Sequence, residues 1–205
     1  MKIIGLTGSI AAGKSTIVGW ISELGIATHD SDCAVHELLG PNGGAVQDVL
    51  AEFGSHFGTI AGGINRKSLG DEVFSAPQKR LTLESILHPK VRQHRDSFIA
   101  KQRNADAAAV VLDVPLLFET GGEVMCDYVI VVYASAKTTA KRALARPGMT
   151  QDKLTSILAS QMPSDDKKVR ADLALDSDLP KDQTCNQLIN WLSVIGLSIV
   201  KHEVD

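Results

Sequence analysis

The segment Gly8-Ser9-Ile10-Ala11-Ala12-Gly13-Lys14-Ser15 carries the clearest chemical signal in this chain. Its spacing fits the pattern G-x-x-x-x-G-K-[ST], in which backbone N–H groups surround the phosphates of a nucleotide. We expect Gly8 and Gly13 to adopt backbone torsions barred to residues with a Cβ, so that these N–H groups can point inward. We expect Lys14 to reach the β- and γ-phosphates and the Ser15 hydroxyl to bind Mg²⁺. The alternative is a glycine turn that only begins an ordinary helix.

Carboxylates follow two of the predicted strands. Asp30 and Asp32 come where a strand over residues 26–30 ends, and a carboxylate there would orient an acceptor hydroxyl and accept its proton. Asp113 ends the strand Val110-Val111-Leu112, where it would hold Mg²⁺ directly or through water. Each has a purely structural alternative: Asp32 as the cap of the following helix, and Asp113 as the cap of a turn.

A basic cluster lies further along the chain, on a helix that Pro147-Gly148 is expected to stop. It comprises Lys137, Lys141, Arg142 and Arg146. Arg142 and Arg146 are four residues apart and would share one helix face. Thr150 is expected to cap a second helix, so two helices meeting at a basic turn would form a lid around residues 142–152. The alternative is a solvated charged face.

The elements that must position these residues alternate between strands and helices. From Ile17 to Leu24, apolar residues recur at three- and four-residue steps, and Gly25 stands where a C-terminal cap is expected. Residues 108–114 and 128–133 are apolar runs typical of strands buried on both faces, and 173–175 is a weaker third run. We therefore expect an α/β fold with a parallel sheet flanked by helices.

Between residues 33 and 106, the apolar spacing indicates helices alone. Apolar faces are expected within residues 46–53, 69–73, 83–87 and 91–102. Pro89 should open the last of these helices at its first position. We expect residues 33–106 to be an insertion that binds a second substrate, because it leaves the carboxyl end of a strand, where ligands bind in parallel sheets. Residues 1–32 and 107–205 would then form the nucleotide-binding core of a single domain over residues 1–205.

Composition narrows the class of protein further. The 21 Lys and Arg residues nearly balance the 24 Asp and Glu residues, which disfavours nucleic acid as a partner. The three cysteines form no C-x-x-C pair, so neither a zinc site nor a disulfide framework is indicated. No apolar stretch is long enough to span a membrane, and the first strand begins too close to Met1 to leave room for a signal peptide. We therefore expect a cytoplasmic protein without a membrane partner, as a monomer or small homo-oligomer.

Several classes of protein use such a phosphate loop. The Asn-Lys-x-Asp and Asp-x-x-Gly strings of GTPases do not occur in the sequence. The candidate base, magnesium ligands and cations instead favour a small-molecule kinase that uses ATP. Two rivals stay open: a kinase for another acceptor, such as a nucleoside monophosphate, and a regulatory module that binds ATP without turning over a small substrate.

Taken together, these residues resemble the dephospho-coenzyme A kinases. The similar segments run almost from end to end: 6–16, 30–32, 36–38, 65–69, 73–74, 87–89, 113–119, Arg142, Arg146, 148–150, Gln161 and 171–172. The strings Leu-His-Pro at 87–89 and Pro-Leu-Leu-Phe-Glu at 115–119 are specific to this family among small kinases.

The resemblance implies a P-loop kinase fold with a helical substrate-binding insertion and a short lid. It implies transfer of the γ-phosphoryl group of ATP, with Mg²⁺, to the ribose 3′-hydroxyl of dephospho-coenzyme A. By position, Asp32 is the catalytic aspartate, and Arg142 and Arg146 are lid cations that act beside Lys14. The implied nucleotide site is Thr7, Gly8, Ser9, Ile10, Ala11, Ala12, Gly13, Lys14, Ser15 and Thr16. The implied acceptor site is Asp32, Arg66, Lys67, His88, Pro115, Leu116, Leu117 and Glu119, and the metal ligands are Ser15 and Asp113.

The chain departs from the family pattern at a few positions. Ser9, Ala11 and Ala12 replace the usual Gly, Gly and Ser of the loop. Alanine at position 11 would cost little if its backbone torsions are negative, so we expect a stiffer or looser loop rather than lost binding. Ser31 is a mild change between Asp30 and Asp32. The string Asp176-Ser177-Asp178 stands where an Asp-Asn pair is common, which weakens the expectation of an adenine contact from that loop.

Overall fold

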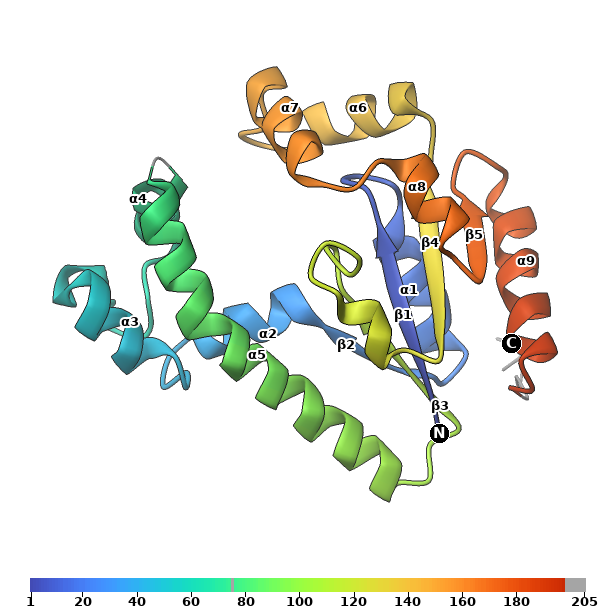
Figure 1. The fold of residues 1–205 in the computed structure, drawn as a ribbon, viewed down its shortest axis with the longest axis horizontal. Helices are drawn as coiled ribbons and strands as arrows, with labels where there is room; N and C mark the ends of the chain where they lie inside the picture. The colour runs from blue at the N-terminus through green and yellow to red at the C-terminus, as the bar shows by residue number, and fades with distance from the viewer. Residues whose placement is uncertain (75, 198–205) are drawn as a thin grey trace. The chain divides into compact units, whose positions relative to one another are not determined.

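A five-stranded sheet crosses the structure, a computed structural model that describes residues 1–74 and 76–197. The strand order is β2-β3-β1-β4-β5 (Figure 1). The strands are β1 (Lys2–Gly8), β2 (Ala27–Asp30), β3 (Ala109–Asp113), β4 (Tyr128–Tyr133) and β5 (Leu173–Asp176). β1 runs parallel to β3 and β4, and β4 runs parallel to β5. The predicted α/β fold with a parallel sheet is confirmed, including the weak run at 173–175.

The chain divides into two compact units, one formed by residues 1–29 with the chain from 102 onward, and the other by residues 30–101. Residues 198–205 of the predicted core lie outside the described residues. The first unit holds most of the sheet and the helices α1 (Lys14–Glu23), α6 (Ala136–Leu144), α7 (Gln151–Ser160), α8 (Ser164–Val169) and α9 (Lys181–Val194), with a short 3-10 helix at Gly122–Met125.

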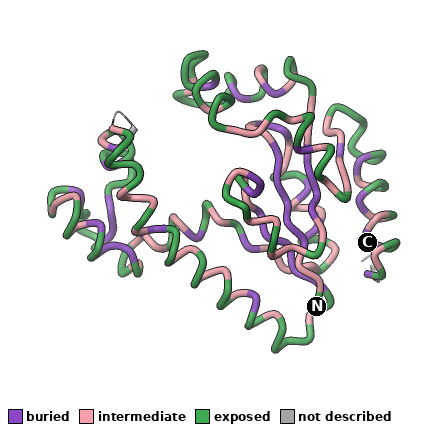
Figure 2. The backbone as a smooth tube through the Cα atoms, viewed as in Figure 1, coloured by how far each residue is buried: buried purple, intermediate pink, exposed green. Residues whose placement is uncertain are grey.

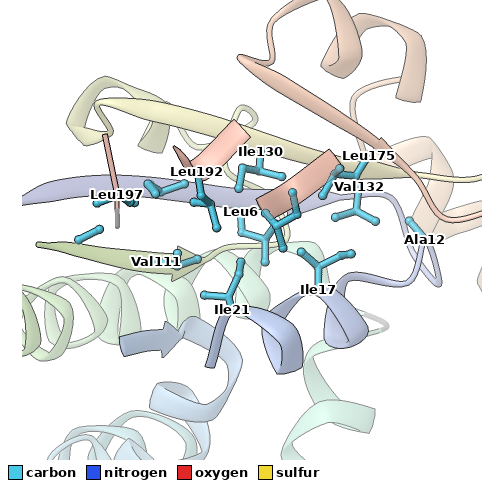
Figure 3. Packing of buried hydrophobic residues seen from close by; sticks show 13 residues of the cluster. Leu6, Ala12, Ile17, Ile21, Val111, Ile130, Val132, Leu175, Leu192 and Leu197 are labelled. Carbon is cyan, nitrogen blue, oxygen red and sulfur yellow. The ribbon is translucent and has the colours of Figure 1, made fainter. Parts of the chain in front are cut away.

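The core of the first unit lies against both faces of β4. Ile130 and Val132 point to a cluster to which α1 contributes Ile17 and Ile21 and α9 contributes Leu192 (Figure 3). Val129 and Val131 point the other way, into a second cluster with Leu117 and Phe118. Because consecutive strand residues alternate between faces, β4 is buried on both sides, as its apolar run predicts. Figure 2 shows the same burial along β1 and β3.

The second unit is helical, with its own apolar cluster. Its helices are α2 (Ser31–Leu38), α3 (Val46–Phe53), α4 (Arg66–Phe74) and most of α5 (Pro77–Asn104), with a 3-10 turn at Ser55–Phe57. The buried side chains at the centre of this unit include Val49, Phe57, Leu69 and Leu87. No helix among the described residues is both long and apolar enough to cross a membrane.

The expectation that Pro89 opens a new helix is wrong. Pro89 lies inside α5, which runs without a break through both of the predicted apolar faces. A proline within a helix removes one hydrogen bond, here to the carbonyl of Ser85. Since Ser85 and Pro89 are both exposed, solvent can take that place, while the buried Leu87 keeps this turn packed in the apolar cluster.

Candidate functional site

The phosphate loop joins β1 to α1 and depends on two glycines for different reasons. Gly13 caps α1 in a left-handed conformation, with φ at +99°, and provides no capping side chain for the first N–H groups of the helix. Those N–H groups and the helix dipole favour an anion at this point. Gly8 is needed because a Cβ there would lie 2.4 Å from the carbonyl oxygen of Val132 on β4. The expectation that both glycines supply special torsions is therefore right for Gly13 and wrong for Gly8.

Ala11 does not meet the condition set for it, because its φ is +57° and not negative. A left-handed conformation costs a residue with a Cβ about 1–2 kcal/mol. The methyl group is buried, with 9% of the residue exposed, and packs against Ala143 of α6 and Leu154 of α7. Burying one methyl group offsets about 0.8 kcal/mol of that cost. The packing of Ala11 thus holds the loop against α6 and α7, although its backbone conformation is strained.

Lys14 and Asp113 form an ion pair at the base of the loop. The Lys14 ammonium group donates to the Asp113 carboxylate, and only 4% of Asp113 is exposed. The Asp113 carboxylate thus pairs with the cation of the loop, a contact that a turn cap alone would not make. Its role as a ligand of Mg²⁺ stays a prediction.

The surroundings of Ser15 and Asp113 suit a magnesium ion that arrives with the nucleotide. Among the residues described, no group of three or more His, Cys, Asp or Glu side chains could hold a metal by itself. Mg²⁺ in phosphoryl-transfer sites uses one or two protein oxygens together with phosphate oxygens and water. The hydroxyl of Ser15, in the exposed first turn of α1, and a single carboxylate match that requirement.

The segment after β3 is tied to the phosphate loop by a buried polar network. Thr7 Oγ1 donates to the carbonyl oxygen of Pro115 over 2.9 Å. Glu119 Oε1 accepts from Lys167 Nζ at 2.9 Å and from the N–H of Met162 at 2.7 Å. Burial would raise the pKa of the Glu119 carboxyl, but these two hydrogen bonds, a third from its own backbone N–H and the charge of Lys167 together outweigh burial and hold that pKa below its usual range. Lys167 is fully buried, so this ion pair is part of the interior of the unit.

The other predicted residues of this segment have different exposures. Leu116 is exposed, whereas Leu117 and Phe118 are buried against Val129 and Val131 of β4. Of the leucines expected at the acceptor site, only Leu116 therefore presents its side chain at the surface. The roles of both toward an acceptor stay predictions.

Arg142 lies beside the phosphate loop. Its Nη1 donates to Ser177 Oγ at 2.8 Å and its Nη2 to the Ser177 carbonyl at 3.0 Å, while Ser177 Oγ donates to the carbonyl of Ala12 at 2.6 Å. On the other side of the loop, the N–H of Ile10 donates to Gln161 Oε1 at 3.1 Å. The structure therefore brings Arg142 together with the loop.

Arg146 is placed differently from the prediction. The helix α6 ends at Leu144, and Arg146 follows in a turn, where its N–H donates to the carbonyl of Ala143. The expectation that Arg142 and Arg146 share a helix face is wrong, because the residue before a proline is driven out of the helical region and the helix ends earlier. Thr150 does cap α7, as predicted, by accepting from the N–H of Lys153.

The remaining predicted residues lie in the second unit. Asp30 is the N-cap of α2, with its carboxylate accepting from the N–H groups of Asp32 and Cys33 at 2.8 and 3.0 Å. The alternative that Asp32 serves as the cap is therefore wrong, and Asp32 stands exposed in the first helical turn. Arg66 and Lys67 are exposed in the first turn of α4, and His88 is exposed on α5.

The sequence patterns do not predict two of these contacts, the ion pair of Lys167 with Glu119 and the bond of Ser177 to the loop. Lys167 lies in the polar run Ser164–Val169, whose charges indicate a solvated helix, and nothing in that run marks one lysine as buried. Ser177 did offer a signal, since it directly follows β5 and so belongs to the edge of the sheet where β1 ends and the phosphate loop begins. A hydroxyl at that edge is a candidate partner for the loop.

Known proteins match the chain along most of its length. A family model described as dephospho-CoA kinase matches residues 2–182. The dephospho-CoA kinase of Rhodospirillum rubrum is 48% identical over 177 residues, which are 86% of this chain and 83% of that protein.

Solved structures agree with the sequence matches. The crystal structure of TT1252 from Thermus thermophilus has a TM-score of 0.79 at 26% identity and covers 96% of this chain and 98% of its own. The dephospho-CoA kinase from Campylobacter jejuni has a TM-score of 0.70 at 25% identity, with 94% and 96% of the two chains covered.

The ion pair between Lys167 and Glu119 predicts a large stability effect. Lys167→Met should lower the free energy of unfolding by about 3 kcal/mol, because it leaves a partly buried carboxylate without its cation. Adding Glu119→Gln should recover a good part of that loss. Because the folded pKa of Glu119 is lowered, the pair stabilises the protein above the unfolded pKa of about 4.3 and ceases to do so as the pH falls through the folded value. Urea unfolding at pH 7 and pH 3 measures both effects.

Lys168→Met is the matched control for that variant. Lys168 pairs with the exposed Asp165, and such surface pairs contribute about 0–1 kcal/mol. Equal losses from Lys167→Met and Lys168→Met would contradict the buried pair.

Ala11 predicts a balance between strain and packing. Ala11→Gly should change the free energy of unfolding by less than about 1 kcal/mol, because relief of a left-handed alanine is offset by the lost methyl contact and by the extra chain entropy of glycine. Ala11→Val should cost more than about 2 kcal/mol, since a β-branched residue tolerates this φ poorly. Urea unfolding of the two variants checks both values, and a tolerated valine would show that position 11 is not constrained.

Proposed function

This chain belongs to the dephospho-CoA kinase family, and from that premise we propose that it transfers the γ-phosphoryl group of ATP to the ribose 3′-hydroxyl of dephospho-coenzyme A. The products are coenzyme A and ADP. The observation that carries the proposal is the phosphate loop with Lys14 paired to Asp113 and Arg142 held beside Gly13, in a chain of this family. A phosphate site that already contains two cations, Lys14 and Arg142, is suited to a nucleoside triphosphate.

In the proposed reaction, the loop N–H groups and Lys14 hold the β- and γ-phosphates. Ser15 and Asp113 would hold the Mg²⁺ that comes with ATP, and that ion would supply positive charge to offset part of the phosphate charge. Arg142 and Arg146 belong to a lid over residues 142–152 and offset the charge on the transferring group. Closure of such a lid would exclude water that otherwise hydrolyses ATP.

Asp32 is the proposed general base. It would orient the 3′-hydroxyl and accept its proton as the new bond to phosphorus forms. Its carboxylate suits this task because Asp30 already caps α2, so Asp32 is not needed to satisfy the helix. It follows the end of β2 by two residues, at the kind of strand end where α/β proteins bind their ligands.

The proposed acceptor lobe is the helical insertion, residues 33–106. Arg66, Lys67 and His88 are exposed there and can meet the diphosphate of dephospho-coenzyme A as cations or hydrogen-bond donors. Pro115, Leu116, Leu117 and Glu119, in the first unit, are also proposed to serve the acceptor, and Leu116 is the exposed apolar residue among them. Residues 1–32 and 107–205 form the proposed nucleotide-binding core, and a cytoplasmic location follows from the same proposal.

A panel of acceptors tests the proposed function. With Mg-ATP, the protein should form ADP at an appreciable rate only when dephospho-coenzyme A is supplied, and the product should carry a new 3′-phosphate by mass spectrometry. Turnover of nucleoside monophosphates at the same rate would instead support the rival kinase. ATP binding without turnover of any acceptor would support a regulatory module.

Asp32→Asn tests the role of the base. Loss of a general base typically costs about 10²–10⁴ in rate, so kcat should fall within that range while the affinity for ATP, measured by calorimetry, stays nearly unchanged. Asp106→Asn is the matched control, because Asp106 is an exposed carboxylate in a turn with φ at +52°, which asparagine tolerates. A kcat for Asp32→Asn close to that of the control would remove Asp32 from the mechanism.

A further inference from the structure

The turn after β5 is built to present Ser177 in one position. The N–H of Ser177 continues the sheet by donating to the carbonyl of Tyr133 at 2.8 Å. The N–H of Asp178 donates to Asp176 Oδ1 at 2.9 Å, and the N–H of Ser135 donates to Asp178 Oδ2 at 2.9 Å. Ser177 is thus held by its own backbone bond to the end of β4, and the carboxylates of Asp176 and Asp178 fix the turn around it by accepting from backbone N–H groups.

The Ser177 hydroxyl joins the phosphate loop to Arg142. A hydroxyl has one proton, and the carbonyl of Ala12, at 2.6 Å, can only accept it. The oxygen lone pairs of Ser177 are therefore left to accept from Arg142 Nη1 at 2.8 Å. Since the Ser177 carbonyl accepts from Nη2 at 3.0 Å, two parallel bonds restrain the plane of the guanidinium group.

These bonds place the guanidinium at the phosphate loop itself. A Cβ built on Gly13 would lie 3.1 Å from Ser177 Oγ and 3.6 Å from Arg142 Nη1. Gly13 is the residue from which α1 begins, so the cation lies beside the proposed anion site. Arg142 is exposed in the last turn of α6, and a free arginine side chain has about 2 kcal/mol of rotamer entropy. A partner that restrains it before the substrates bind has a direct effect on catalysis.

We propose that Ser177 is a positioning residue for the phosphoryl transfer, because it holds Arg142 against the phosphate loop in the orientation that meets the γ-phosphate. This inference rests on the proposed function and adds to it a residue that acts through Arg142. Arg146, which lies beyond the end of α6, has no comparable restraint from Ser177. Of the two proposed lid cations, Arg142 is accordingly the one already held beside the loop when ATP binds.

A double-mutant cycle with Ser177→Ala and Arg142→Ala tests the proposal. Misplacing a catalytic group by 1 Å can cost about 100-fold in rate, so releasing Arg142 should lower kcat by about 10-fold in Ser177→Ala, with the KM for dephospho-coenzyme A changed far less. In the Arg142→Ala background, Ser177→Ala should change kcat by less than about 2-fold, since its target is gone. The Ser177→Thr variant keeps the hydroxyl, so its kcat should stay near the value of the original protein.

Ser193→Ala is the matched control, because this exposed serine on α9 donates only within its own helix, to Ile189. Its kcat should be unchanged. Equal loss of kcat from Ser177→Ala with and without Arg142 would overturn the proposal in favour of a direct effect of Ser177 on the loop through Ala12. An unchanged kcat in Ser177→Ala would overturn it outright.

A second readout separates this proposal from the proposed function. In ¹⁵N NMR spectra, the Arg142 guanidinium should show restrained rotation in the original protein and free rotation in Ser177→Ala, whether or not dephospho-coenzyme A is the acceptor. Free rotation in both proteins would overturn the positioning role. If restrained rotation is observed but no transfer to dephospho-coenzyme A occurs, the proposed function fails while the restraint on Arg142 is upheld.

Discussion

The phosphate loop must hold its backbone in one conformation before any phosphate is bound, and the first unit is built around that constraint. N–H groups that point toward the anion site cannot also bond within the loop, and the internal bond from the N–H of Ala12 to the carbonyl of Ser9 at 3.1 Å holds only part of it. It is therefore held from outside. Ser177 bonds to the Ala12 carbonyl, Gln161 to the Ile10 N–H, and β4 comes so close to Gly8 that a methyl group would not fit.

The residues around Gln161, which binds the loop, are held in turn by a buried ion pair. Gln161 and Met162 follow the end of α7, and Met162 donates to the carboxylate of Glu119, which the buried Lys167 neutralises. A buried ion pair is a poor source of net stability compared with apolar packing, because both charges lose their hydration. The contribution of this pair is positional, because the carboxylate fixes the end of α7 relative to the segment that carries Pro115.

Much of this arrangement follows from the sequence. The strand positions, the loop between β1 and α1 and the Thr150 cap depend on local signals of periodicity and capping, and the structure confirms these three predictions. Two of the errors arose where tertiary context decides. Pro89 continues a helix because Leu87 is packed in the core, and Gly8 is required by the carbonyl of Val132, on a strand more than a hundred residues away. The buried state of Lys167 has the same origin, because it depends on a partner that no spacing within its own helix reveals. Arg146 is different, because Pro147 acts locally to end α6 before position 146.

Two of the departures from the usual family pattern, Ala11 and Ser177, contact the same helix, α6. The Ala11 methyl packs against Ala143 of α6, and Ser177 binds Arg142 of the same helix. Glycine at position 11 would have no methyl group for that contact, and its backbone would be less restricted. Since both residues connect the loop to the last turn of α6, a shift of the loop on binding phosphate would be transmitted to Arg142 through rigid contacts rather than absorbed by a flexible backbone. The strained backbone of Ala11 therefore accompanies a loop of restricted conformation, which helps to keep Arg142 in place.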